Sequence, residues 1–175
     1  EQGKSRFKVF NHRMHVAALR LMELETDLRH AVDARDLRLV YQPIVRLRDR
    51  RVVGFEALLR WTHPTHGPVN PTEFITLAED AGLIYPIDYG VLHQVCRDLS
   101  SWMNGRGPGA SARSLNVHVN VSGNHFRNPF LVGEVEAALL DSGLPPACLT
   151  LEITESAFVD NLSTAADVLG KLKNL

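Results

Sequence analysis

Two stretches in the first third of the chain alternate apolar and polar residues with a period of two. The first covers residues 37–45 and the second covers residues 52–61. This period is typical of β-strands, because successive side chains point to opposite faces. The charged segment 46–51 between them is too short for a crossover, so we expect an antiparallel hairpin. Pro43 indicates that the first strand lies at a sheet edge or contains a bulge.

Elsewhere the apolar spacing changes to three and four, which indicates helices. The segment Asn70-Pro71-Thr72-Glu73 is a helix start with a capping side chain, Pro at the first position and Glu at the third. Other helices are expected from about residue 16, from about residue 86, from Asn128-Pro129 and over 165–175, and further strands over 115–121 and 149–154. Helices that alternate with strands favour an α/β fold with a largely parallel sheet.

Three predicted strands carry a polar side chain near their ends, on the face opposite their apolar residues. These side chains are Glu56, Asn120 and Glu152. A glutamate that faces a core is unfavourable unless it is paired or binds a cation. Two carboxylates beside an amide form an all-oxygen set, which suits Mg²⁺ or Mn²⁺ better than Zn²⁺. The alternative is a polar sheet face that simply meets water.

Three histidines are further candidates for chemistry. His63 and His66 are close in sequence, but neither cysteine supplies further ligands at a zinc-site spacing, so loop histidines are favoured. His118 shares a strand face with Asn120. It is either a neighbour of the predicted site or a histidine whose hydrogen bonds are satisfied on that face.

Composition narrows the class of protein. Nineteen Lys and Arg against twenty Asp and Glu give a net charge of -1, which offers no broad electrostatic reason to bind DNA, RNA or an anionic membrane. No apolar run approaches the roughly eighteen residues of a membrane helix, and the N-terminus lacks the apolar core of a secretory signal. The only cysteines, Cys96 and Cys148, are far apart, which argues against a disulfide framework. A reduced, cytoplasmic domain is expected.

An ordered set of short segments then carries a resemblance to a known family. The segments are 41–45 (YQPIV), 54–61 (GFEALLRW), 71–75 (PTEFI) with 78–79 (AE), 119–122 (VNVS) and 151–156 (LEITES). Together they resemble the EAL domain, the bacterial module that hydrolyses cyclic di-GMP. The resemblance extends from about residue 37 to the end of the chain. The Glu-Ala-Leu tripeptide alone would be uninformative, whereas the ordered set is specific.

The resemblance implies an α/β fold: a modified TIM-type (β/α)₈ barrel whose first strand is antiparallel, with roughly its first half present in this chain. Residues 37–175 are then the N-terminal half of an EAL domain. Residues 1–36 are expected to form a linker and leading helix, and they are similar to the connector that follows a GGDEF domain. Active sites of such barrels lie at the C-terminal ends of the strands.

The resemblance also assigns site residues. The ligands of a Mg²⁺ or Mn²⁺ cofactor are Glu56, Asn120 and Glu152. The residues that line the cyclic di-GMP site are Gln42, Leu58 and Arg60, with the Arg60 guanidinium near a phosphate. Glu155 supports a loop that carries other catalytic groups. The implied reaction is metal-dependent hydrolysis of cyclic di-GMP to linear pGpG; the alternative is a non-catalytic EAL-like module that binds cyclic di-GMP or a protein partner.

EAL domains normally continue with an Asp-Asp-Phe-Gly-Thr-Gly segment and, later, a Lys, a Glu and a Gln, none of which follows in this chain. A complete barrel takes about 250 residues. The chain is therefore expected to be a fragment of a longer protein and to be inactive by itself. A partial barrel exposes an unpaired strand edge and an incompletely covered sheet face, which predicts self-association as a dimer.

Overall fold

The computed structural model describes residues 12–105, 115–153 and 162–175. In chain order, its elements are α1 (His12–Ala34), β1 (Arg38–Arg46), β2 (Arg51–His63), β3 (Gly67–Val69), α2 (Pro71–Asp80), α3 (Ile84–Asn104), β4 (Asn116–Val121), α4 (Gly123–Phe126), α5 (Leu131–Ser142), a 3₁₀ turn (Pro146–Cys148), β5 (Leu149–Ile153) and α6 (Leu162–Lys173). Among these residues, no helix is both long enough and apolar enough to cross a lipid bilayer.

The strands form one sheet in the order β1-β2-β4-β5, with β3 paired to the end of β2. β1 and β2 are antiparallel, whereas β2, β4 and β5 run parallel. This confirms the predicted hairpin and the largely parallel sheet. Both expectations for Pro43 are met, because β1 lies at the end of the strand order and its register shifts directly afterwards, between Ile44 and Val45.

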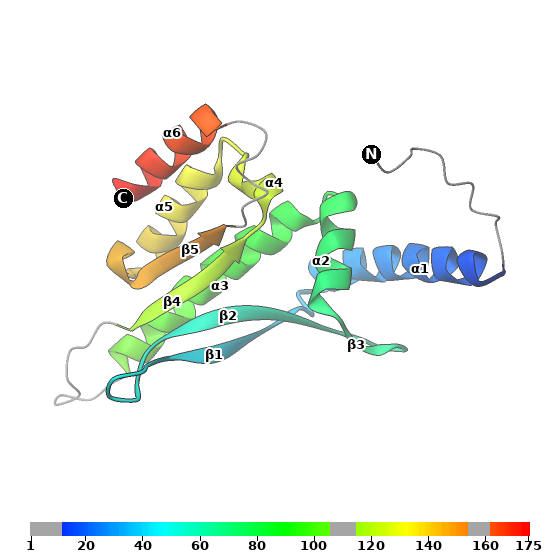
Figure 1. The fold of residues 1–175 in the computed structure, drawn as a ribbon, viewed down its shortest axis with the longest axis horizontal. Coiled ribbons are helices and arrows are strands. Elements are labelled where there is room, and N and C mark those ends of the chain that lie inside the picture. Colours follow the sequence, from blue (N-terminus) through cyan, green and yellow to red (C-terminus); the bar gives the residue numbers. More distant parts are fainter. Residues whose placement is uncertain (1–11, 106–114, 154–161) are drawn as a thin grey trace, which may run out of the picture.

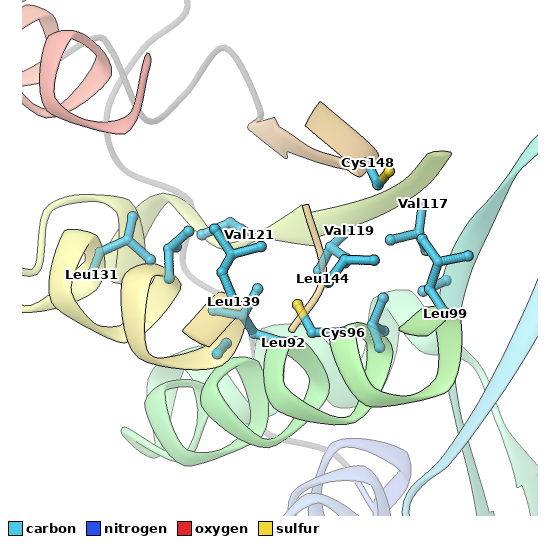
Figure 2. Packing of buried hydrophobic residues seen from close by; sticks show 14 of the residues in the cluster. Leu92, Cys96, Leu99, Val117, Val119, Val121, Leu131, Leu139, Leu144 and Cys148 are labelled. Carbon is cyan, nitrogen blue, oxygen red and sulfur yellow. The ribbon is translucent and has the colours of Figure 1, made fainter. Parts of the chain in front are cut away.

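One hydrophobic core lies between the sheet and helices α3 and α5. The three valines of β4, Val117, Val119 and Val121, are buried on the face that meets these helices. Figure 2 shows them opposite side chains that include Cys96 and Leu139. Burial raises the pKa of the Cys96 thiol to about 11. Cys96 is therefore a core residue and not a reactive thiol, because the thiolate is the nucleophilic form.

A second core joins α1 to the other end of the sheet. Leu24 and Leu28 of α1 are fully buried with Trp61 of β2 and Phe74 of α2. Figure 1 shows α1 extending away from the sheet near β3, while α5 and α6 gather beside β5. The C-terminal half of α1 thus packs on the domain through buried leucines.

The two histidines differ in their surroundings: His66 is exposed in the turn after β2, as expected of a loop histidine, whereas His63 is buried beside this second core. His63 ends β2 and is 2% exposed. Its Nε2 lies 2.8 Å from the Asp27 carboxylate of α1, and its Nδ1 accepts hydrogen bonds from the backbone N–H groups of Thr65 and His66. Because Nδ1 accepts, Nε2 carries the proton and donates to Asp27. His63 therefore connects α1 to the turn after β2 by hydrogen bonds.

Most predicted element ends agree with the structure, and the differences have local causes. Asn70 caps α2 by accepting from the N–H of Thr72, as expected. The helix expected to open at Asn128 begins instead at Leu131, because the side chain and carbonyl of Asn128 first close a turn by accepting from the N–H groups of Phe130 and Leu131. α1 begins at His12 and not near residue 16. The short elements β3 and α4 were not predicted, since three or four residues show no measurable period.

Candidate functional site

The sheet register places the predicted metal ligands on one face of adjacent strands. In the β2–β4 pairing, Glu56 lies opposite His118, and in the β4–β5 pairing, Asn120 lies opposite Glu152. The alternate residues of β4 point to the buried core, so His118 and Asn120 point to the other face. Glu56, Asn120 and Glu152 therefore share the sheet face opposite the core, as their alternation along the strands predicted.

Two hydrogen bonds connect these side chains across the strands. Asn120 Nδ2 donates to Glu56 Oε1 at 3.0 Å, which joins β4 to β2. His118 Nδ1 lies 2.6 Å from Glu152 Oε1, which joins β4 to β5. The middle strand thus supplies one partner to the carboxylate on each side, so the three predicted ligands lie on one sheet face in two separate hydrogen-bonded pairs.

The oxygen atoms of the three predicted ligands suit a hard divalent cation. Glu56 and Glu152 provide carboxylate oxygens, and Asn120 has an amide carbonyl oxygen in addition to the nitrogen that donates to Glu56. Within the described residues, no three His, Cys, Asp or Glu side chains are close enough together to hold a metal ion by themselves. Glu155, the predicted supporting residue, lies outside the described residues.

The three residues predicted to line the dinucleotide site share this sheet face. Gln42 of β1 is directly opposite Glu56 in the antiparallel pairing. Leu58 and Arg60 follow Glu56 at even spacing along β2, and both are half-buried. The Arg60 guanidinium donates to the carbonyl oxygen of Leu59 at 2.9 Å. The predicted substrate residues therefore adjoin the predicted metal ligands on β2.

A second polar cluster, which sequence reasoning missed, lies just beyond the end of β4. His125 of α4 is 1% exposed and lies between two carboxylates. Its Nδ1 is 3.3 Å from Asp88 of α3, and its Nε2 is 2.6 Å from Glu134 of α5. Asp88 also accepts from the backbone N–H of Ser122, the first residue after β4. No periodic pattern reveals this cluster, because its members come from three separate helices.

The two carboxylates favour the charged form of the His125 imidazole. Burial favours the neutral form and lowers the pKa, but the hydrogen bonds and charges of Asp88 and Glu134 outweigh it and raise the pKa above the ordinary 6.5. Both ring nitrogens then donate. The cluster ties the turn after β4, and hence the strand that carries Asn120, to two of the packed helices.

Comparison with known proteins places this geometry in a family. The sequence profile described as the EAL domain matches residues 25–175. The chain is 37% identical over 172 residues to the bifunctional diguanylate cyclase/cyclic di-GMP phosphodiesterase MucR of Pseudomonas aeruginosa, covering 98% of this chain and 24% of MucR. It is 38% identical over 173 residues to the cyclic di-GMP phosphodiesterase NbdA of the same organism, covering 99% of this chain and 22% of NbdA.

Solved structures agree. A MucR phosphodiesterase structure in complex with c-di-GMP matches with a TM-score of 0.79 and 39% identity, over 87% of this chain and 60% of that one. The EAL enzyme Bd1971, in a form with bound cAMP and cyclic di-GMP, matches with a TM-score of 0.83 and 30% identity, over 90% of this chain and 43% of that one. The open sheet is therefore part of the TIM-like barrel of these proteins, as predicted. The chain belongs to the EAL domain family.

Proposed function

We propose that this chain supplies the N-terminal part of the active site of a cyclic di-GMP phosphodiesterase, which cleaves its substrate to linear pGpG. The observation that carries the proposal is the pair of hydrogen bonds on one sheet face, between Asn120 and Glu56 and between His118 and Glu152. The cyclic di-GMP phosphodiesterases MucR and NbdA, to which the chain is similar, support the reaction and the substrate.

Glu56, Asn120 and Glu152 would hold Mg²⁺ or Mn²⁺ through oxygen atoms. Such a cation, when bound, lowers the pKa of a coordinated water and stabilises the charge that develops on the attacking and leaving oxygens. The hydrogen bond from Asn120 orients the Glu56 carboxylate before any cation arrives. Glu155 has the proposed task of supporting a neighbouring loop.

The remaining site residues bind the dinucleotide in this proposal. Gln42 offers an amide beside Glu56, and Leu58 offers an apolar surface on the same face. The Arg60 guanidinium can exchange its bond to the Leu59 carbonyl for a bidentate bond to a phosphate, which is the stronger charge-assisted interaction. The substrate would thus lie along β2, with one phosphate near the metal ligands.

The chain spans about a quarter of MucR and about three fifths of the matched MucR phosphodiesterase structure. We therefore assign residues 37–175 to the N-terminal half of an EAL domain and residues 1–36 to a linker with a leading helix. The family match begins within α1, at residue 25. The reaction is accordingly proposed for a protein in which the rest of the domain is also present.

A Glu56→Ala substitution in a complete EAL domain carrying this sequence tests the function. We expect hydrolysis of cyclic di-GMP with Mg²⁺ or Mn²⁺ to fall at least about a hundredfold, since a lost metal ligand removes several kcal/mol of charge stabilisation. The measurement is the rate of pGpG formation by chromatography. Glu136→Ala on the exposed face of α5 is the matched control and should keep its rate.

Residues 1–175 alone provide the complementary measurement, with negligible pGpG expected because only part of the site is present. If the complete wild-type domain binds cyclic di-GMP but does not cleave it, the alternative function, a non-catalytic binding module, replaces the proposed phosphodiesterase. Full activity of the Glu56→Ala variant would refute the metal assignment.

The isolated chain is also proposed to self-associate. Within the described part of the chain, β5 pairs only with β4, so its other edge is open. Val40, on the sheet face that carries the predicted site, is 42% exposed. Open edges and exposed apolar faces promote association. Light scattering should give the mass of a dimer at micromolar concentration; a folded monomer across the accessible concentration range would contradict this.

A further inference from the structure

Of the four side chains in the two hydrogen-bonded pairs, His118 alone has no proposed role. His118 is two residues before Asn120 and lies between the strands that carry Glu56 and Glu152. Its contact with Glu152, 2.6 Å between Nδ1 and Oε1, is one of the shortest side-chain hydrogen bonds of the sheet. The two side chains are 27% and 42% exposed, so the bond is partly shielded from water. A bond of this kind restricts the carboxylate it contacts.

The direction of the hydrogen bond follows from its chemistry. An ionised carboxylate can only accept, so His118 Nδ1 carries the proton and donates. The bond engages Oε1, so Oε2 keeps both of its lone pairs for a cation. In metal sites, such donors to a ligating carboxylate fix its orientation, and their loss typically weakens metal binding by about 10–100-fold.

The register shows that the bond selects one orientation of Glu152. The residue directly opposite Glu152 is Asn120, yet the carboxylate bonds to His118, one position back along the same face. Glu56 shows the reverse arrangement, since it lies opposite His118 and accepts from Asn120. Each carboxylate is therefore hydrogen-bonded to a β4 side chain diagonally across from it, and the two carboxylates use different β4 side chains.

We infer that His118 is a positioning residue that holds the Glu152 carboxylate for cation binding through the bond to Oε1. The inference rests on the proposed function, because it takes Glu152 as a ligand. His118 itself acts through Glu152 and does not bind the cation. Without the imidazole, Glu152 rotates freely and must be ordered when the cation binds, which lowers the affinity.

The test measures Mn²⁺ affinity directly in a complete EAL domain that carries this sequence, from the loss of the free-ion electron paramagnetic resonance signal. We expect His118→Ala to weaken binding about tenfold. His118→Asn should restore most of it, because the Asn amide nitrogen can occupy the place of Nδ1. His30→Ala, at an exposed position of α1, is the matched control. Thermal unfolding of every variant shows whether the fold is kept.

A second spectroscopic readout distinguishes positioning from direct ligation. Electron spin echo modulation of the bound Mn²⁺ should lack the coupling of a directly bound imidazole nitrogen in the wild type. A strong nitrogen coupling that disappears in His118→Ala would overturn the inference by making His118 a ligand. Unchanged or tighter Mn²⁺ binding by His118→Ala would overturn it as well, as would a loss that His118→Asn does not restore.

Glu152→Gln separates the failure of this inference from that of the proposed function. If Glu152→Gln abolishes Mn²⁺ binding and His118→Ala does not weaken it, only the role of His118 is wrong. If Glu152→Gln binds Mn²⁺ as the wild type does, the metal assignment of the proposed function fails, and the inference fails with it.

Discussion

A Gly54→Ala variant should lose about 3 kcal/mol of stability, at the upper end of what overpacking in a well-packed interior costs. Gly54 is buried in β2, opposite Asn116 at the start of the parallel pairing with β4. A Cβ at this position would lie 2.4 Å from the carbonyl oxygen of Asn116. Because that oxygen belongs to the backbone of a neighbouring strand, the contact can be relieved only by moving the strands apart.

The separation should be visible at the site as well as in the stability. Glu56 is two residues from Gly54, and its bond to Asn120 spans the same pair of strands. We expect a lower midpoint of denaturant unfolding together with weaker Mn²⁺ binding. Gly133→Ala on α5, where a Cβ would meet nothing within 4 Å, is the matched control and should be neutral or slightly stabilising. Equal unfolding midpoints for both variants would contradict the close-approach argument.

The sheet and its polar face could be predicted from the sequence because both depend on local alternation. The parity of Glu56, Asn120 and Glu152 was sufficient to place them on one face, and the short connection before β2 was sufficient for the hairpin. The likeness of the EAL motif segments to a known family then supplied the barrel. These features need only the period of two and a set of ordered motifs.

The pairings of the side chains could not be predicted, because they depend on how separate elements meet. Parity places His118 beside Asn120, but it does not say that His118 takes Glu152 while Asn120 takes Glu56. Gly54 is similar, since its need for a hydrogen in place of a side chain arises from the backbone of β4. Such contacts become visible only once the strands have a common register.

His125 illustrates the same limit at the level of packing. Its partner Asp88 is 37 residues earlier in the chain, and the two meet because α3 and α4 both pack near the end of β4. The sequence around His125 shows only a short helical turn. A buried charged histidine is therefore a property of the assembled helices and carries no signature in the local pattern of apolar residues.

His125→Ala should destabilise the chain by about 3–5 kcal/mol, the range found when one partner of a buried ion pair is removed. The variant leaves the Asp88 and Glu134 carboxylates, which are 11% and 24% exposed, without the imidazolium between them. It also loosens the turn at Ser122, because Asp88 would no longer be fixed from two sides. The measurement is the free energy of unfolding from urea denaturation at pH 6, where the wild-type imidazole is charged.

His125→Gln provides the pH test, because glutamine can hydrogen-bond but cannot be protonated. The pKa of His125 is raised in the folded chain, so its contribution is fully present below the ordinary value of 6.5 and is lost as the pH rises through the folded value. In that window the native state binds more protons than the unfolded state, and the wild type should lose stability with rising pH more steeply than His125→Gln does. His30→Gln at an exposed position of α1 should keep the wild-type slope. Identical slopes for the wild type and His125→Gln would mean that the cluster does not hold a charged imidazole, and the turn after β4 would then depend on packing alone.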